Sequence, residues 1–179
     1  MKYIALLRAI NVGGHVVKMD VLRGHFESLG FSNVETFIAS GNVIFDSPAR
    51  PTALQKMIEA RLQESLGYEV ATFIRTTAEV DAVSKYQPFS AAAMKSAGAL
   101  CVGFLEKTLS QDACDALMNM KTAIDDFHVH GREVYWLCLN RQSDSTFSNA
   151  RFERTLKVRA TFRGVSTVAK LAAKFHASP

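Results

Sequence analysis

The chain has 179 residues, of which 48% are hydrophobic and 21% are charged. This balance excludes an intrinsically disordered chain, and no apolar run approaches the roughly 20 residues that a membrane-spanning helix needs. The N-terminus has no leader pattern and the three cysteines lie in apolar sequence, so we expect a cytoplasmic protein with reduced, buried thiols.

The net charge of +4 at pH 7 is unevenly distributed along the chain. Residues 148–179 contain seven basic residues and one acidic residue, a charge of +6, so the rest of the chain carries −2. A basic segment of this kind can meet phosphate groups, but it is also typical of an ordinary solvated face.

The first predicted elements are a buried strand and a helix. Lys2–Arg8 is a short, nearly continuous apolar run, which is typical of a buried strand. A loop with Gly13 and Gly14 follows it. Asp20 and Gly30 are residue types that begin and end helices, so we predict a helix between them.

A hairpin and a second helical segment complete the first half. The hairpin strands are Val34–Ser40 and Val43–Asp46, joined by Gly41-Asn42, because both turn residues tolerate positive φ. The elements expected next are a helix after Thr52 that stops at Gly67, a strand over Glu69–Arg75, and a helix whose start has the capping-box pair Thr76 and Glu79.

The same order returns after an alanine-rich connector. Strands are expected over Leu100–Glu106, Asp126–His130, Glu133–Leu139 and Arg159–Arg163, with helices capped by Ser110, around Thr146–Leu156, and from Ser166. The repeated βαββαβ order predicts an α+β protein of two ferredoxin-like subdomains packed into one compact body. We expect these subdomains at residues 1–89 and 99–179, with a connector over 90–98.

The pattern YIALLRAINVGG, followed by LGF and TFIASGNVIF, extends from Tyr3 to Phe45. It resembles the protein family catalogued as domain of unknown function sixteen ninety-seven, and the resemblance continues through Pro88-Phe89 and returns at residues 161–171. Ala9 stands where the family usually has Gly, and Gly164 and Val165 stand where it has Asn and Trp. The resemblance implies two ferredoxin-like halves, and it brings no established activity.

The loop after the first strand is the leading candidate for a binding site. Glycines let backbone N–H groups approach a ligand, and a helix N-terminus favours an anion. We therefore predict that a small anionic ligand binds at this loop and in the cleft between the halves. The candidate contacts are Arg8, Asn11, Gly13, Gly14, Lys18, Ser40 and Asn42. The alternative is a tight structural turn, and the spacing matches neither common nucleotide-binding motif.

Asp126, His128 and His130 alternate along a predicted strand and therefore share one face. Two imidazoles and a carboxylate are suitable ligands for zinc or iron, but an exposed strand face explains the same pattern. We predict no metal and no other cofactor.

A second function class is nucleic-acid binding through the basic C-terminal segment. Its candidate phosphate contacts are Arg75, Arg163, Lys170 and Lys174. The aromatic motif of RNA-binding modules with this topology is absent, so we do not favour this class. A third class is an interaction protein that forms a homodimer through an open sheet face. No pattern of catalytic residues assigns a reaction type.

Overall fold

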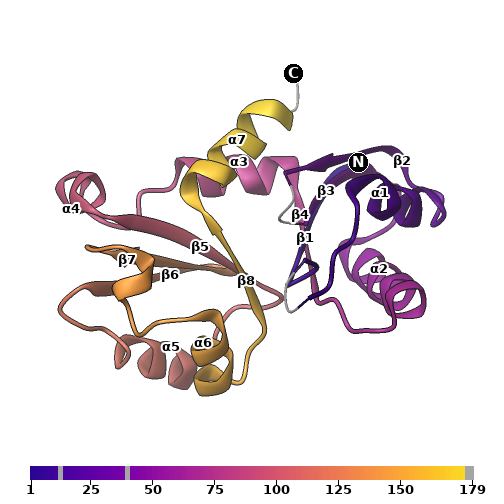
Figure 1. The fold of residues 1–179 in the computed structure, drawn as a ribbon. Helices are drawn as coiled ribbons and strands as arrows, with labels where there is room; N and C mark the ends of the chain where they lie inside the picture. The colour runs from indigo at the N-terminus through magenta and orange to yellow at the C-terminus, as the bar shows by residue number, and fades with distance from the viewer. Residues whose placement is uncertain (12–13, 39–40, 176–179) are drawn as a thin grey trace. The chain divides into compact units, whose positions relative to one another are not determined.

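The computed structural model, which describes residues 1–11, 14–38 and 41–175, divides into two compact units (Figure 1). The first unit comprises Met1–Asp81 and the end of the chain from Leu171, and the second comprises Ala82–Lys170. Each unit contains a four-stranded antiparallel sheet with helices between its strands. The predicted α+β class and the βαββαβ order are therefore confirmed.

The first unit follows the order expected from the sequence. Its elements are β1 (Lys2–Leu7), α1 (Met19–Glu27), β2 (Ser32–Phe37), β3 (Asn42–Asp46), α2 (Pro51–Leu66), β4 (Thr72–Thr76) and the first part of α3 (Thr77–Lys85). The strand order in the sheet is β2-β3-β1-β4, so the two strands that lie farthest apart in the chain, β1 and β4, are neighbours. The predicted capping box is confirmed, because Thr76 N–H donates to Glu79 at 2.7 Å and Glu79 N–H donates to Thr76 Oγ1 at 3.1 Å.

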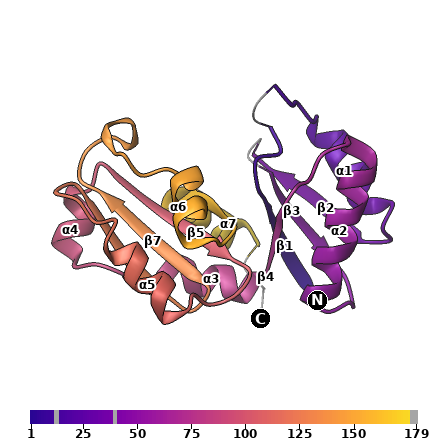
Figure 2. The same cartoon turned by 90° about the horizontal axis from the view of Figure 1, so that it is seen from below.

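The core of the first unit lies between its sheet and the helices α1 and α2, which lie together on one face (Figure 2). Side chains alternate along a strand, so Tyr3, Ala5 and Leu7 of β1 face these helices. The intervening Ile4 and Leu6 are also fully buried. Both faces of β1 are therefore apolar and inaccessible to water, as the uninterrupted hydrophobic run requires.

The second unit repeats this architecture. Its elements are the end of α3, α4 (Ala91–Ser96), β5 (Ala99–Leu105), α5 (Gln111–Met118), β6 (Asp125–His130), β7 (Glu133–Cys138), the 3₁₀ turn η1 (Gln142–Asp144), α6 (Asn149–Leu156), β8 (Ala160–Gly164) and the first part of α7 (Val165–Phe175). The strand order β6-β7-β5-β8 reproduces that of the first sheet, element for element. The internal repeat that the sequence indicates is thus a repeat of topology.

Helices α5 and α6 cover one face of the second sheet (Figure 1). Trp136 and Cys138 of β7 pack on that side, while Tyr135 and Leu137 occupy the opposite side and are also buried. Ser110 caps α5 as expected, because its Oγ accepts from Ala113 N–H at 3.3 Å.

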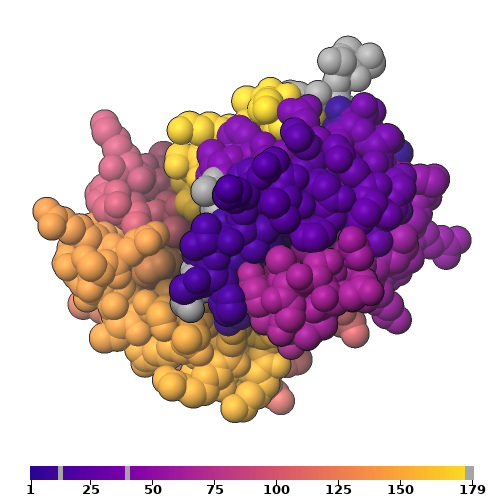
Figure 3. Space-filling model, turned by 45° about the vertical axis from the view of Figure 1, so that its right-hand side comes forward, coloured from indigo at the N-terminus to yellow at the C-terminus, as the bar shows by residue number. Residues whose placement is uncertain are grey.

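The boundary between the two compact units falls after Asp81, within α3, and again after Lys170, within α7. The subdomain boundaries expected from the sequence, residues 89 and 99, remain a prediction. In the space-filling view, the indigo and purple surface belongs to the first unit and the orange surface to the second (Figure 3).

Candidate functional site

The loop between β1 and α1 begins where β1 leaves the sheet. Arg8 is half-buried, and its backbone N–H still donates to the carbonyl of Ala71 at 2.9 Å. Ala9 then adopts a φ of +56°, a left-handed conformation that is strained for any residue with a Cβ. Glycine, which the resemblance described above implies at this position, would adopt this geometry without strain.

Asn11 closes the loop with its side chain. Its Oδ1 accepts a 2.7 Å hydrogen bond from the backbone N–H of Val17, six residues further on. Gly14, between them, has a φ of +88°. Gly13 lies outside the described residues. The Asn11 bond joins the start of the loop to the residue just before the N-cap of α1.

A contact that the sequence did not indicate holds the same loop from the other side. The ring of His15 stacks on Tyr68, with centroids 3.9 Å apart, and the Tyr68 hydroxyl donates to the carbonyl of Ile10 at 3.1 Å. Burial raises the pKa of Tyr68, so its hydroxyl remains a donor at neutral pH. Tyr68 is 58 residues away from Ile10, which is why no local pattern identifies the pair.

Helix α1 begins at the far end of this loop. Its N-cap residue, Lys18, is extended, and its side chain makes no capping hydrogen bond within the described structure. Lys18 and Asp20, which lies in the first turn, are both exposed. Arg8 thus lies at the start of the loop, and Lys18 lies beside the backbone N–H groups at the start of α1.

The hairpin residues predicted to join this site have structural contacts. Asn42 is fully buried, and its Nδ2 donates to the carbonyl of Phe37 at 3.0 Å. Gly41 has a φ of +77°, and a Cβ there would lie 2.8 Å from Cγ2 of Ile10. Ser40 lies outside the described residues. The Gly41-Asn42 turn is thus needed for close packing against the residues that follow β1, and the binding role assigned to Asn42 stays a prediction.

Asp126, His128 and His130 do share one face of β6, as expected, but each has a partner in the protein. Lys121 Nζ lies 2.6 Å from Asp126, His128 Nε2 lies 2.8 Å from the Tyr86 hydroxyl, and the His130 ring stacks on Tyr86 at 4.1 Å. Across the described ranges, no group of three or more His, Cys, Asp or Glu residues has an arrangement that could hold a metal ion.

Burial lowers the pKa of His128 below its ordinary value. The neighbouring His130 and Lys121 act in the same direction, while Asp126 opposes them. His128 is therefore neutral at pH 7, and its Nε2 is available as a hydrogen-bond partner for Tyr86.

The predicted phosphate contacts fall into two groups. Arg75 and Arg163 occupy corresponding positions, two residues before α3 and α7, and are buried with exposures of 1% and 8%. Arg163 Nη1 donates to Thr161 Oγ1 at 2.8 Å, and burial lowers its pKa to about 10. Lys170 is exposed, whereas Lys174 donates to Glu35 at 3.0 Å.

The cysteines are free thiols, and two of them are buried as predicted. Burial raises the pKa of Cys101 to about 11, and its Sγ accepts a hydrogen bond from Gln142 Nε2 at 2.8 Å. Burial also raises the pKa of Cys138. Both thiols are therefore protonated at neutral pH and are poor nucleophiles.

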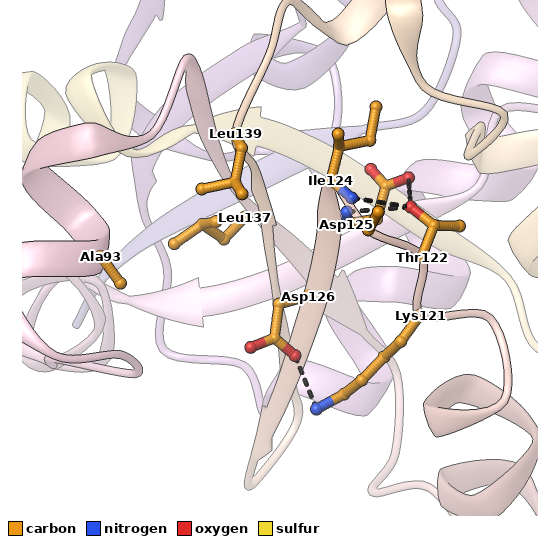
Figure 4. Close-up of a pocket in the computed structure, with 9 residues that line it drawn as sticks. Ala93, Lys121, Thr122, Ile124, Asp125, Asp126, Leu137 and Leu139 are labelled. Atoms are coloured by element: carbon orange, nitrogen blue, oxygen red, sulfur yellow. Dashed lines mark hydrogen bonds and ion pairs between the residues drawn. The ribbon is translucent and has the colours of Figure 1, made fainter.

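A pocket of about 360 Å³ lies beside the start of β6 (Figure 4). Lys121 reaches Asp126 at its edge, and Thr122 bonds to Asp125. Leu137 and Leu139 supply its apolar side. Since the charged groups that line this pocket already bond within the protein, we assign no ligand to it.

No helix among the described residues is long and apolar enough to cross a membrane. No curated protein matches the chain. Among solved structures, a conserved bacterial protein, SP0830 from Streptococcus pneumoniae, is similar in fold, with a TM-score of 0.71 and 23% sequence identity, and the match covers 96% of this chain and 97% of that one. The model of a family described as protein of unknown function, DUF1697, matches residues 1–135, which include the β1–α1 loop and the hairpin. The chain therefore belongs to the DUF1697 family.

Proposed function

We propose that this protein binds a small anionic molecule at the loop between β1 and α1. Arg8, Asn11, Gly13, Gly14 and Lys18 form or flank the site. The observation that supports the proposal is the start of α1, where the N-cap residue is a lysine that makes no side-chain capping bond within the described structure.

The chemistry of a helix start explains this choice of ligand. The first backbone N–H groups of a helix lack partners within the helix, and the aligned peptide dipoles favour negative charge there. Lys18 adds a positive charge at the same end, and Arg8 adds another at the start of the loop. The exposed Asp20 carboxylate in the first turn opposes them and weakens the attraction for any anion.

Contacts at the two ends of the loop support a binding role because they restrain the residues there. The Asn11–Val17 bond and the Tyr68–Ile10 bond hold both ends of the loop without a ligand. Restraining these residues before binding reduces the conformational entropy that they lose when a ligand binds.

A thermal-shift measurement with potassium phosphate tests the proposal, with sodium chloride at equal ionic strength as the reference. A ligand that binds only the folded protein raises its melting temperature. We expect a phosphate-specific shift in the unaltered protein, and the Lys18→Gln variant should need about tenfold more phosphate for the same shift.

The matched control is Lys56→Gln, which removes the same charge from an exposed position on α2. It should leave the phosphate response unchanged. Equal responses of both variants, or a shift that sodium chloride reproduces, would exclude a site at this loop.

Contacts within the basic segment weigh against nucleic-acid binding as the function. Arg151 donates to Thr146 Oγ1 at 2.7 Å, Arg163 is buried, and Lys174 is paired with Glu35. These cations bond within the protein, so we do not put that function forward, and the proposed binding activity implies no reaction.

A further inference from the structure

A second cavity, of about 390 Å³, lies in the second unit on the face of the sheet opposite α5 and α6. Its floor consists of Leu100 and Val102 of β5 and Tyr135 of β7. Its walls come from the end of α3 and the segment after it, from Met94 of α4, and from the start of α7. The volume lies within the range of about 300–1,000 Å³ that is usual for small-molecule sites.

Tyr135 is the unusual residue of this cavity. The side chain is 1% exposed, and its hydroxyl has no hydrogen-bond partner among the described residues. Buried hydroxyl groups almost always have one, because leaving such a group unpaired is unfavourable. Tyr135, with its unpaired hydroxyl, therefore lies among the residues that line a cavity whose other floor residues are aliphatic.

The side chains next to Tyr135 do not bond to its hydroxyl. The Tyr86 ring lies 5.3 Å from the Tyr135 ring, but the Tyr86 hydroxyl bonds to His128 Nε2 at 2.8 Å. Val102, directly across the strand pair from Tyr135, has no polar side-chain atom. Burial raises the pKa of Tyr135, so the hydroxyl keeps its proton and can donate it in a hydrogen bond.

We infer that this cavity is a binding site for a small, largely apolar molecule with one carbonyl oxygen, which accepts a hydrogen bond from the Tyr135 hydroxyl. The aliphatic floor favours an apolar body, and the polar side chains of Ser84, Lys85 and Gln87 belong to the walls. The Tyr135 hydroxyl is the donor on the floor of the cavity, and it fixes the orientation of the ligand as polar groups do in mostly apolar sites. This site lies in the second unit and is independent of the proposed anion site in the first.

A pair of variants tests whether the hydroxyl is unpaired. Tyr135→Phe removes only that group and should raise the melting temperature by about 2–4 °C. Tyr3→Phe is the matched control, because the buried Tyr3 hydroxyl donates to the carbonyl of Ala49 at 3.0 Å. Its removal should lower the melting temperature by a similar amount.

Two probes of nearly the same shape test the ligand class. Acetophenone has a carbonyl oxygen where α-methylstyrene has a methylene group. Binding is followed by NMR of methyl-labelled methionine, since Met94 lines the cavity and its signal is assigned with Met94→Leu. We expect both probes to shift the Met94 signal. Tyr135→Phe should weaken the binding of acetophenone by about fivefold to tenfold and leave the affinity for α-methylstyrene unchanged.

Three results would overturn the inference. They are a Tyr135→Phe variant that loses stability as Tyr3→Phe does, a Met94 signal that neither probe shifts, and an equal effect of Tyr135→Phe on both probes. None of them bears on phosphate binding at the β1–α1 loop, so the two proposals fail or stand separately.

Discussion

The carboxylate of Asp125 on β6 accepts a 2.8 Å hydrogen bond from the indole Nε1 of Trp136 on the neighbouring strand β7. The same oxygen accepts a 2.7 Å bond from Ser145 Oγ, and the other oxygen accepts one of 2.8 Å from Thr122 Oγ1. Asp125 is 3% exposed. One buried carboxylate thus ties together the turn before β6, the strand β7 and the segment after η1.

Replacing Asp125 with Ala should lower the free energy of unfolding by about 2–4 kcal/mol. The substitution leaves the buried Trp136 N–H and the hydroxyls of Ser145 and Thr122 without their acceptor. Urea unfolding followed by fluorescence measures the loss, because Trp136 is the single tryptophan of the chain. Asp112→Ala, on the exposed surface of α5, is the control and should cost only about 0.5 kcal/mol.

The same carboxylate predicts a pH dependence of stability. Burial by itself raises the pKa of Asp125, but the hydrogen bonds from Ser145, Trp136 and Thr122 outweigh it and hold the pKa below 3.8. A group whose pKa is lower in the folded state binds fewer protons there, so its stabilisation is present above pH 3.8 and is lost as pH falls through the folded-state pKa. Urea midpoints between pH 2.5 and 6 should fall more steeply at the acid end for the unaltered protein than for Asp125→Asn. Parallel curves would refute the assignment.

Ala9→Gly should stabilise the protein by about 0.5–1 kcal/mol. The φ of +56° at Ala9 costs an L-residue with a Cβ roughly 1–2 kcal/mol, and the greater freedom of glycine in the unfolded chain offsets part of the gain. Ala60→Gly, on the exposed side of α2, is a matched control and should destabilise by about 1 kcal/mol. Chemical denaturation compares the two, and a loss of stability at both positions would contradict the prediction.

Gly41→Ala should destabilise the first unit by about 2–3 kcal/mol, from backbone strain and from the approach of the new Cβ to Ile10. Gly30→Ala separates the two causes. Gly30 has a similar φ of +81°, but a Cβ there meets nothing within 4 Å. It should therefore show the backbone cost alone, about 1 kcal/mol, in the same denaturation measurement. Equal losses at the two positions would show that packing against Ile10 contributes nothing.

The candidate site was predictable only in part. Arg8, Asn11 and Lys18 stand in one loop because they are close in the chain, so their proximity needed no tertiary information. The roles of Asn11 and Asn42 could not be read from residue type, since an amide that binds a ligand and one that closes a turn look alike in a sequence. The Tyr135 cavity gave no sequence signal, because a tyrosine in an apolar strand is ordinarily a core residue.

The sequence by itself determined the elements and their repetition. Apolar runs, the Gly41-Asn42 turn and the Thr76–Glu79 capping box act between residues that are adjacent or three apart, so they operate in any compact arrangement of the chain. Tertiary structure alone decided which distant side chains meet. Tyr68 with Ile10, and Lys174 with Glu35 at a separation of 139 residues, depend on how strands and helices pack, and no local pattern specifies that packing.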